Sequence, residues 1–225
     1  MNHNPIIVAL DVPSSEAAVS LATKLNGKVG LFKIGLQLFT AEGPKVIEAV
    51  KKVAPDVGIF LDLKLHDIPN TMRGAIQSAK NLGVEMMTIH SGSGFTHMQA
   101  CVEEAGDDIK ILAVTVLTSM DVLDCSSAGH TRNPTELVQL RVAAAAEARC
   151  FGIVCSGQEL DAGLPKKLWK VVPGIRPSGS AVGDQKRVVT PRQARDDGAS
   201  VLVIGRPISK ADDPLAAAKA IEETL

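Results

Sequence analysis

The sequence predicts an α/β protein whose strands and helices alternate in a (β/α)8 barrel, the TIM-barrel architecture. Eight short runs rich in β-branched and aliphatic residues recur along the 225 residues, and segments with the apolar spacing of helices lie between them. Each run has about 28 residues to itself, which is enough for a strand, a helix and two loops. Continuous apolar strands are typical of a parallel sheet that is buried on both faces. An open, doubly wound sheet is the alternative architecture that this pattern allows.

The eight expected strands are short and mostly apolar, and the β-branched residues that recur in them favour strands. In chain order they cover residues 6–11, 29–35, 57–64, 84–90, 109–117, 149–156, 169–175 and 200–206.

Helices are expected between these strands. Apolar residues recur three and four positions apart most clearly at residues 14–25, 43–54, 70–83 and 213–225, which is the spacing of one buried helix face. The glycine-rich stretch SGSGF at 91–95 lacks the third glycine of a dinucleotide-binding loop and the Gly-Lys pair of a P-loop. We therefore expect it to be a turn before a helix.

Two connections are longer than is usual for a barrel. They cover residues 119–136 after the fifth strand and 176–191 after the seventh, and both are rich in polar residues. Long loops at the carboxyl ends of barrel strands commonly carry binding residues. No linker or low-complexity tract divides the chain, so residues 1–225 are expected to form one domain.

Composition excludes several partners. The chain has 24 Lys and Arg against 25 Asp and Glu, a net charge of −1, so nothing draws the whole molecule to nucleic acid or an anionic membrane. Five Phe, one Trp and no Tyr are too few for a platform that stacks single-stranded bases. No stretch approaches the roughly 18 apolar residues of a membrane span. We expect no nucleic-acid partner and no membrane partner.

The cysteines and the first residues point to a cytoplasmic protein. The four cysteines contain no Cys-x-x-Cys pair and no spacing suited to zinc, and the sequence begins MNHNPIIVALD without a basic segment before its first apolar run. A chain of this length does not need disulfides for stability. The expectation is a reduced cytoplasmic protein.

Charged residues interrupt or follow several of the apolar runs, namely Asp11, Lys33, Asp62, Lys64 and Arg206. A buried strand tolerates a charge only when that charge is paired. The carboxyl ends of all barrel strands meet at one face, so these residues are expected to converge in a site. Isolated surface ion pairs are the alternative interpretation.

Asp62, Lys64 and Asp67 form the pattern D-x-K-x-x-D. Residues two apart on a strand share a face, so Asp62 and Lys64 should be neighbours. Carboxylates beside a lysine favour its ammonium form, whereas a Schiff-base nucleophile needs the neutral amine. Lys64 is therefore predicted to donate a proton rather than to form a covalent adduct.

The same region offers ligands for a divalent metal, since His66 and His90 accompany Asp62 and Asp67. Lys33 and Lys64 argue against a metal, because two ammonium groups already neutralise the carboxylates and repel a cation. We expect no metal, and His66 and His90 as hydrogen-bonded residues behind the site.

An anion site is expected at the eighth strand and the loop before it. Gly205 permits close approach of the backbone, and Arg206 can hold an anion with two parallel hydrogen bonds. The glycine-rich, basic loop 176–189 contains Arg176, Gln185, Lys186 and Arg187. Barrels often bind phosphate with the loops after strands seven and eight, so this loop is predicted to be a phosphate-gripping lid. A plain solvated loop is the alternative.

Four segments together resemble one family. LDLKLHDIPNT at 61–71, VVPGIRP at 171–177, GDQKRVVTP at 183–191 and IGRPIS at 204–209 closely resemble the bacterial-type orotidine 5′-monophosphate decarboxylases. The resemblance extends over nearly the whole chain, with the motifs in the family's order. It implies a homodimeric (β/α)8 barrel that converts orotidine 5′-monophosphate to uridine 5′-monophosphate, the last step of pyrimidine nucleotide synthesis, without a metal or an organic cofactor.

The resemblance also implies roles for individual residues. Lys64 is the expected proton donor to C6 of the pyrimidine. It belongs to a network of alternating charge made by Lys33, Asp62, Lys64 and Asp67, in which Asp67 comes from the neighbouring subunit. The implied substrate contacts are Asp11 and Lys33 for the ribose, Ile68 and Thr71 for the partner's site, Thr118 and Ser119 for the pyrimidine, and Arg176, Gln185, Gly205 and Arg206 for the phosphate.

Two other functions remain open at this point. The first is a magnesium-dependent sugar-phosphate decarboxylase or aldolase of the same superfamily, but those enzymes carry glutamate where this chain has Lys33. The second is a nucleotide-binding barrel without activity, since fold alone does not fix function. Against it, Lys64 and both flanking aspartates are intact.

Overall fold

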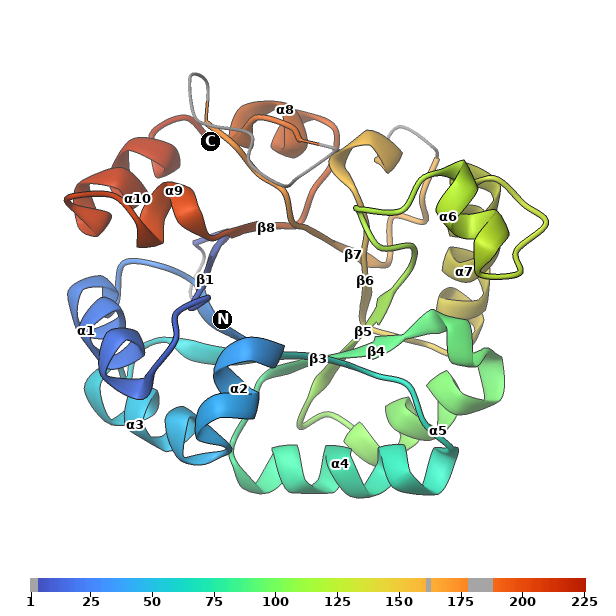
Figure 1. The fold of residues 1–225 in the computed structure, drawn as a ribbon, viewed down its shortest axis with the longest axis horizontal. Helices are drawn as coiled ribbons and strands as arrows, with labels where there is room; N and C mark the ends of the chain where they lie inside the picture. Colours follow the sequence, from blue (N-terminus) through green and yellow to red (C-terminus); the bar gives the residue numbers. More distant parts are fainter. Residues whose placement is uncertain (1–3, 161–162, 178–187) are drawn as a thin grey trace.

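The computed structural model describes residues 4–160, 163–177 and 188–225. Within them, parallel strands close into a barrel in the order β1 to β8, and the helices form an outer ring around it (Figure 1). Pairing of Ile7 in the first strand with Val203 in the last closes the barrel. The predicted (β/α)8 architecture is therefore confirmed, and the open sheet is excluded.

Seven of the eight strands lie inside the runs predicted for them, and the third extends one residue beyond its run, to Leu65. The strands are β1 Ile6–Ala9, β2 Leu31–Gly35, β3 Gly58–Leu65, β4 Met86–His90, β5 Lys110–Val114, β6 Gly152–Val154, β7 Trp169–Val172 and β8 Val201–Ile204. Most end earlier than the apolar runs do. Asp11 and Arg206 consequently follow their strands and lie at the carboxyl-end rim of the barrel.

The α-helices of the described residues are α1 Ser15–Leu25, α2 Leu36–Glu42, α3 Lys45–Val53, α4 Pro69–Asn81, α5 Phe95–Ala105, α6 Val122–Ser127, α7 Pro134–Glu147, α8 Pro191–Asp196, α9 Arg206–Ser209 and α10 Pro214–Glu222. Capping residues start several of them. Ser14 accepts a hydrogen bond from the backbone of Ala17, and Asn133 and Glu136 form a reciprocal capping box, which satisfies free backbone N–H groups. In the described part of the chain, every helix is too short or too polar to span a membrane.

The connection after β5 is more ordered than the sequence suggested. Residues 119–136 were expected to be a long polar loop, but they contain α6. Asp121 caps this helix together with Asp124, and Cys125 anchors it in the core. A single buried residue in six gives no apolar periodicity, so the pattern could not reveal the helix. The stretch 91–95 is a turn before a helix as predicted: a 3-10 turn at Ser91–Ser93 precedes α5.

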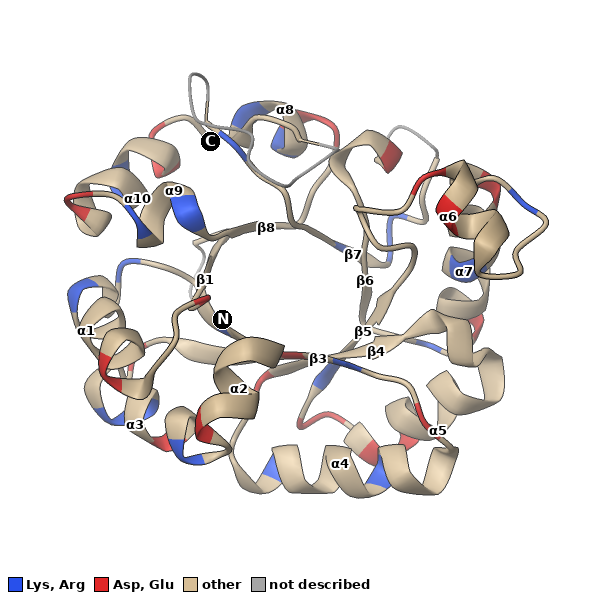
Figure 2. Ribbon diagram, in the orientation of Figure 1, with Lys and Arg blue, Asp and Glu red and all other residues tan. Residues whose placement is uncertain are grey.

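The side chains of the barrel strands point into two separate hydrophobic cores. Ile6 and Val8 belong to the larger core between strands and helices, whereas Ile7, Leu31 and Phe60 belong to the smaller core inside the barrel. Positions two residues further along a strand share the same face. The barrel interior above the inner core therefore receives Lys33, two residues after Leu31, and Asp62, two residues after Phe60. Elsewhere, Lys and Arg intermingle with Asp and Glu on the outer helices (Figure 2).

Candidate active site

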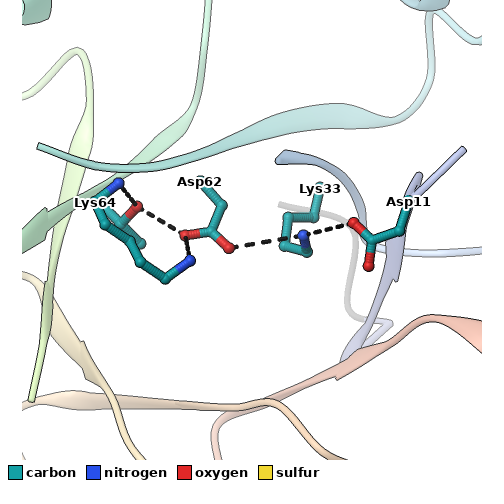
Figure 3. Close-up of polar contacts among 5 residues, drawn as sticks. Asp11, Lys33, Asp62 and Lys64 are labelled. Carbon is teal, nitrogen blue, oxygen red and sulfur yellow. Dashed lines mark hydrogen bonds and ion pairs between the residues drawn. The ribbon is translucent and has the colours of Figure 1, made fainter. Parts of the chain in front are cut away.

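The charged residues predicted from the strand ends form a chain of ion pairs at the mouth of the barrel (Figure 3). Lys33 Nζ lies 3.0 Å from Asp11 Oδ1 and 3.6 Å from Asp62 Oδ2. Lys64 Nζ lies 2.9 Å from Asp62 Oδ1. Negative and positive groups thus alternate from Asp11 to Lys64, and the predicted convergence of these four residues is observed.

Asp62 is the centre of this arrangement and is ionised at neutral pH. Burial by itself raises the pKa of its carboxyl, but the ammonium groups of Lys33 and Lys64 and the hydrogen bonds to it outweigh burial and hold the pKa below its usual value. One of those hydrogen bonds comes from Thr88 Oγ1, 2.8 Å from Asp62 Oδ1. Two cations and one hydroxyl therefore stabilise the carboxylate.

Lys64 reaches Asp62 through a distorted strand. The pairing of β3 with β4 shifts register between Leu61 and Leu65, and Lys64 has a φ of 51°, which is unfavourable for a residue with a side chain. Its backbone N–H donates to Thr88 Oγ1 at 2.9 Å. The predicted contact of Asp62 with Lys64 is confirmed, but a bulge rather than regular alternation accompanies it. Bulges commonly redirect a side chain next to an active site.

A cavity of about 430 Å³ opens beside these residues. It is lined by Ala9, Asp11, Lys33, Gln37, Asp62, Pro173, Gly174, Arg176, Val203, Gly205, Arg206 and Lys210. Asp11 follows β1, Lys33 lies in β2 and Asp62 lies in β3. The other cationic residues come from the segments after β7 and β8. One end of the cavity therefore carries both carboxylates and an ammonium group, and the other end carries only cationic groups.

The predicted anion site lies at the cationic end. Arg176 follows β7 and donates from Nη1 to the Ile175 carbonyl at 2.8 Å. A Cβ built on Gly205 would lie 3.6 Å from Asp11 Oδ2, an ordinary contact, so there is space for a side chain at this position. Gln185, Lys186 and most of the predicted lid lie at residues 178–187, outside the described residues.

Three predicted site residues lie away from the cavity of their own chain. Asp67, Ile68 and Thr71 occupy the connection from β3 to α4 and its first turn, and all three are exposed. Asp67 Oδ1 accepts a hydrogen bond from the Ile68 backbone at 2.7 Å. These residues do not line the cavity that holds Asp62.

The two predicted pyrimidine contacts are also outside that cavity. Thr118 lines a neighbouring hollow of about 630 Å³ between the end of β5 and α7, and Ser119 is exposed. The structure thus places them near the barrel rim without bringing them to Asp62.

The two histidines considered as metal ligands stack on one another. Their ring centroids are 5.3 Å apart, and His90 Nδ1 accepts a hydrogen bond from Gly92 N at 3.1 Å. Burial, with Arg141 next in effect, lowers the pKa of His90 to about 4, so this ring is neutral at pH 7. Among the described residues, no group of three or more His, Cys, Asp and Glu is arranged to hold a metal ion.

Comparison with known proteins identifies the family. The model of the orotidine 5′-phosphate decarboxylase / HUMPS family matches residues 4–221. The chain belongs to this family. Relatives from Novosphingobium aromaticivorans and Erythrobacter litoralis, both named orotidine 5′-phosphate decarboxylase, are 52% and 49% identical over 99% of this chain and 99% of their own. The crystal structure of orotidine 5′-phosphate decarboxylase from Lactobacillus acidophilus superposes with a TM-score of 0.85 at 32% identity, covering 98% of each chain.

Membership of the orotidine 5′-phosphate decarboxylase / HUMPS family confirms the resemblance read from the motifs. The structure also places three residues at the site that the sequence analysis did not identify: Gln37, Thr88 and Lys210. Thr88 is the one polar residue inside the apolar run MMTI. Lys210 lies four residues after Arg206, the spacing of neighbours on a helix face. These two features of the sequence could have identified Thr88 and Lys210 as site residues.

Proposed function

We propose that the protein decarboxylates orotidine 5′-monophosphate to uridine 5′-monophosphate, the last step of pyrimidine nucleotide synthesis, without a metal or an organic cofactor. The observation that carries the proposal is the alternating chain Asp11, Lys33, Asp62 and Lys64 beside a cationic cavity end. The names of relatives about half identical over the full length support the same activity.

The two ends of the cavity suit the two ends of a nucleotide. A phosphate is best placed among Arg176, Gly205 and Arg206, since guanidinium groups bind phosphate through paired hydrogen bonds. Gln185 is proposed to bridge phosphate and base from the lid. The ribose hydroxyls then face Asp11 and Lys33, and the pyrimidine carboxylate faces Asp62.

Lys64 performs the chemistry in this arrangement. Cleavage of the bond from C6 to the carboxylate carbon releases carbon dioxide and leaves the electron pair on C6. An ammonium group placed there stabilises the developing negative charge before any transfer occurs. Lys64 Nζ then gives its proton to C6, which forms the C6–H bond of the product, and the neutral amine regains a proton from solvent. Asp62, held ionised, keeps the ammonium of Lys64 in place at 2.9 Å.

Asp62 also acts on the substrate itself. Two carboxylates that face each other repel, and loss of carbon dioxide relieves this repulsion. Binding of the distant phosphate supplies the free energy that holds the two groups together. Arg206 is therefore expected to affect the rate although it does not touch C6.

We further propose that the protein acts as a homodimer with shared sites. Asp67, Ile68 and Thr71 are exposed and away from their own cavity, and the Ile68 side chain is 63% exposed. Leu123, in the segment after β5, is 79% exposed. Contact with another chain would remove these apolar side chains from water, which is favourable. A second subunit would cover them and bring Asp67 to the partner's Lys64.

The remaining assignments follow from the same proposal. Thr118 and Ser119 contact the pyrimidine, which requires the segment after β5 to move toward the cavity when substrate binds. Loop 176–189 closes over the phosphate, and residues 1–225 work as one domain. The cysteines Cys101, Cys125, Cys150 and Cys155, all within the described residues, are buried and form no disulfide, in keeping with a cytoplasmic enzyme.

A magnesium-dependent enzyme acting on sugar phosphates is the second candidate, because the family description covers more than one activity. The position of Lys33 favours the nucleotide decarboxylase. Its ammonium group occupies the space between Asp11 and Asp62, the two carboxylates that a cation at the cavity would need.

Turnover in the presence of a chelator tests the proposal. Orotidine 5′-monophosphate is incubated with the purified protein in excess EDTA, and its ultraviolet absorbance is followed. Conversion to the spectrum of uridine 5′-monophosphate is expected. Turnover of sugar phosphates only, and only with magnesium, would establish the second candidate, and tight nucleotide binding without turnover would show a barrel that has lost activity.

A further inference from the structure

Gly35, the last residue of β2, adjoins the ion pair of Lys33 with Asp11. Its backbone is extended, with φ −101° and ψ −177°, a conformation that any residue adopts. A Cβ built on it would lie 2.9 Å from Lys33 Nζ and 3.5 Å from Asp11 Oδ1. The backbone therefore does not demand glycine here, but a side chain at this position would displace the Lys33 ammonium.

The Lys33 side chain lies along its own strand. Residues two apart on a strand share a face, so the aliphatic stem of Lys33 runs over Gly35 toward the rim. The side chain is 11% exposed, and its ammonium contacts Asp11 and Asp62 at 3.0 and 3.6 Å. The bare backbone of Gly35 thus forms one wall of the space in which this ammonium is held.

Gly35 differs in this respect from Gly152, another crowded glycine of the barrel wall. At Gly152 an added Cβ would meet the backbone carbonyl and the Cβ of Trp169, atoms that cannot move without moving the strand. At Gly35 the nearest atom is the end of a flexible side chain. A methyl group there would leave the barrel intact and displace only the ammonium.

We propose that Gly35 is a positioning residue for the decarboxylation: its missing side chain seats the Lys33 ammonium between Asp11 and Asp62. The inference rests on the proposed function and deepens it, because it names the residue that sets the geometry of the charged network. Gly35 itself is not among the residues that line the cavity.

The first test compares Gly35→Ala with Gly74→Ala. Gly74 lies in α4, and a Cβ added there meets nothing within 4 Å, so it controls for the glycine-to-alanine change itself. Displacing a charged group by about 1 Å can cost on the order of a hundredfold in rate. We expect Gly35→Ala to lower kcat/KM at least about tenfold with Tm changed by no more than about 2 °C, and Gly74→Ala to leave kcat/KM unchanged. A Gly35→Ala enzyme as active as wild type would overturn the proposal.

A double-mutant cycle separates positioning of Lys33 from a general structural role. If Gly35 acts only through the Lys33 ammonium, removing that ammonium removes the effect. In a Lys33→Ala background, Gly35→Ala should change the Kd for uridine 5′-monophosphate by less than about twofold, although it weakens binding in the wild-type background. Equal losses in both backgrounds would contradict the role assigned to Gly35.

A third measurement needs no substrate and no turnover. The aspartate carboxyl groups are followed by 13C NMR during a pH titration of wild type and Gly35→Ala. Moving the ammonium away should raise the titration midpoint of Asp62 in the variant, because Lys33 helps to keep that carboxyl ionised. Unchanged titration would overturn the inference about Gly35, whereas a wild-type protein inactive toward orotidine 5′-monophosphate would refute the proposed function alone.

Discussion

Asp62 connects the two lysines of the site, and its ionised state depends on atoms contributed by three strands. Lys33 belongs to β2, Lys64 to β3 and Thr88 to β4, and all three act on the Asp62 carboxylate. Thr88 is fully buried and is not among the residues that line the cavity. Its hydroxyl links the carboxylate of Asp62 to the backbone of Lys64, so it fixes both residues at once.

Replacing Thr88 by valine removes this link without changing the size of the side chain. Burial still raises the pKa of Asp62 while one of the hydrogen bonds that lower it is lost, so the pKa rises. A carboxyl with a depressed pKa is active above that pKa and loses its charge as the pH falls through it. We expect the acid limb of the kcat/KM profile to move to higher pH in Thr88→Val.

Thr115→Val is the matched control for this experiment, because Thr115 is an equally buried threonine that donates to the Val154 carbonyl and does not contact Asp62. Its acid limb should stay at the wild-type position. An acid limb that is identical in wild type and Thr88→Val would show that Asp62 does not govern activity at low pH.

Lys210 lines the cationic end of the cavity, where the phosphate is proposed to bind. A charge that contacts the phosphate equally in the ground state and the transition state alters KM and leaves kcat unchanged. We expect Lys210→Met to raise KM about three- to tenfold, the effect of one partly exposed ionic contact. Arg206→Ala should lower kcat/KM further. Steady-state kinetics measure KM and kcat of these variants. Lys219→Met, at an exposed position, is the control. A Lys210→Met enzyme with the KM of wild type would exclude a contact between Lys210 and the phosphate.

At the scale of the elements, the bulge in β3 is the feature that the sequence could not reveal. A bulge is a relation between two strands, here the shifted pairing of Leu61 and Leu65 with β4, and the residues of one run do not encode it. The runs themselves were predictable because each is apolar on both faces. Their ends were not, since residues such as Asp11 continue an apolar run without pairing in the sheet.

The strained backbone of Lys64 has a measurable consequence. A φ of 51° costs a residue with a Cβ about 1–2 kcal/mol, and glycine avoids this cost. Lys64→Gly should therefore be more stable than Lys64→Ala by about 1 kcal/mol, the reverse of the usual order in a strand. Urea denaturation at pH 7 measures both. Equal stabilities, or a more stable alanine variant, would mean that Lys64 is not held in this conformation.

At the scale of the whole molecule, two site residues that lie close together in the sequence are separated in the structure. The family motif DLKLHDIPNT contains both Lys64 and Asp67, but only Lys64 contacts Asp62, which lines the cavity of its own chain. Residues that are neighbours in the sequence therefore belong to two different active sites in the proposed dimer. No pattern in one chain encodes which copy receives Asp67, because that depends on how two copies pack.

Mixing two inactive variants tests the shared site. In a dimer of one Lys64→Ala and one Asp67→Ala subunit, one site lacks both residues and the other has both. Random exchange of equal amounts puts half of the subunits into such dimers, so about one quarter of wild-type activity should return. Recovery is measured after exchange has been verified by mass spectrometry of the intact dimers. Complete exchange without recovered activity would contradict the contribution of Asp67 across the interface.

The central claim is that the Lys64 ammonium delivers a proton to C6, and the reverse of that step tests it most directly. Uridine 5′-monophosphate is incubated with the enzyme in D2O, and loss of the C6 proton is followed by 1H NMR. A site that stabilises negative charge at C6 and exchanges protons through Lys64 should replace this proton by deuterium, and Lys64→Ala, with nucleotide bound at saturation, should not. Equal exchange by wild type and Lys64→Ala would contradict the account.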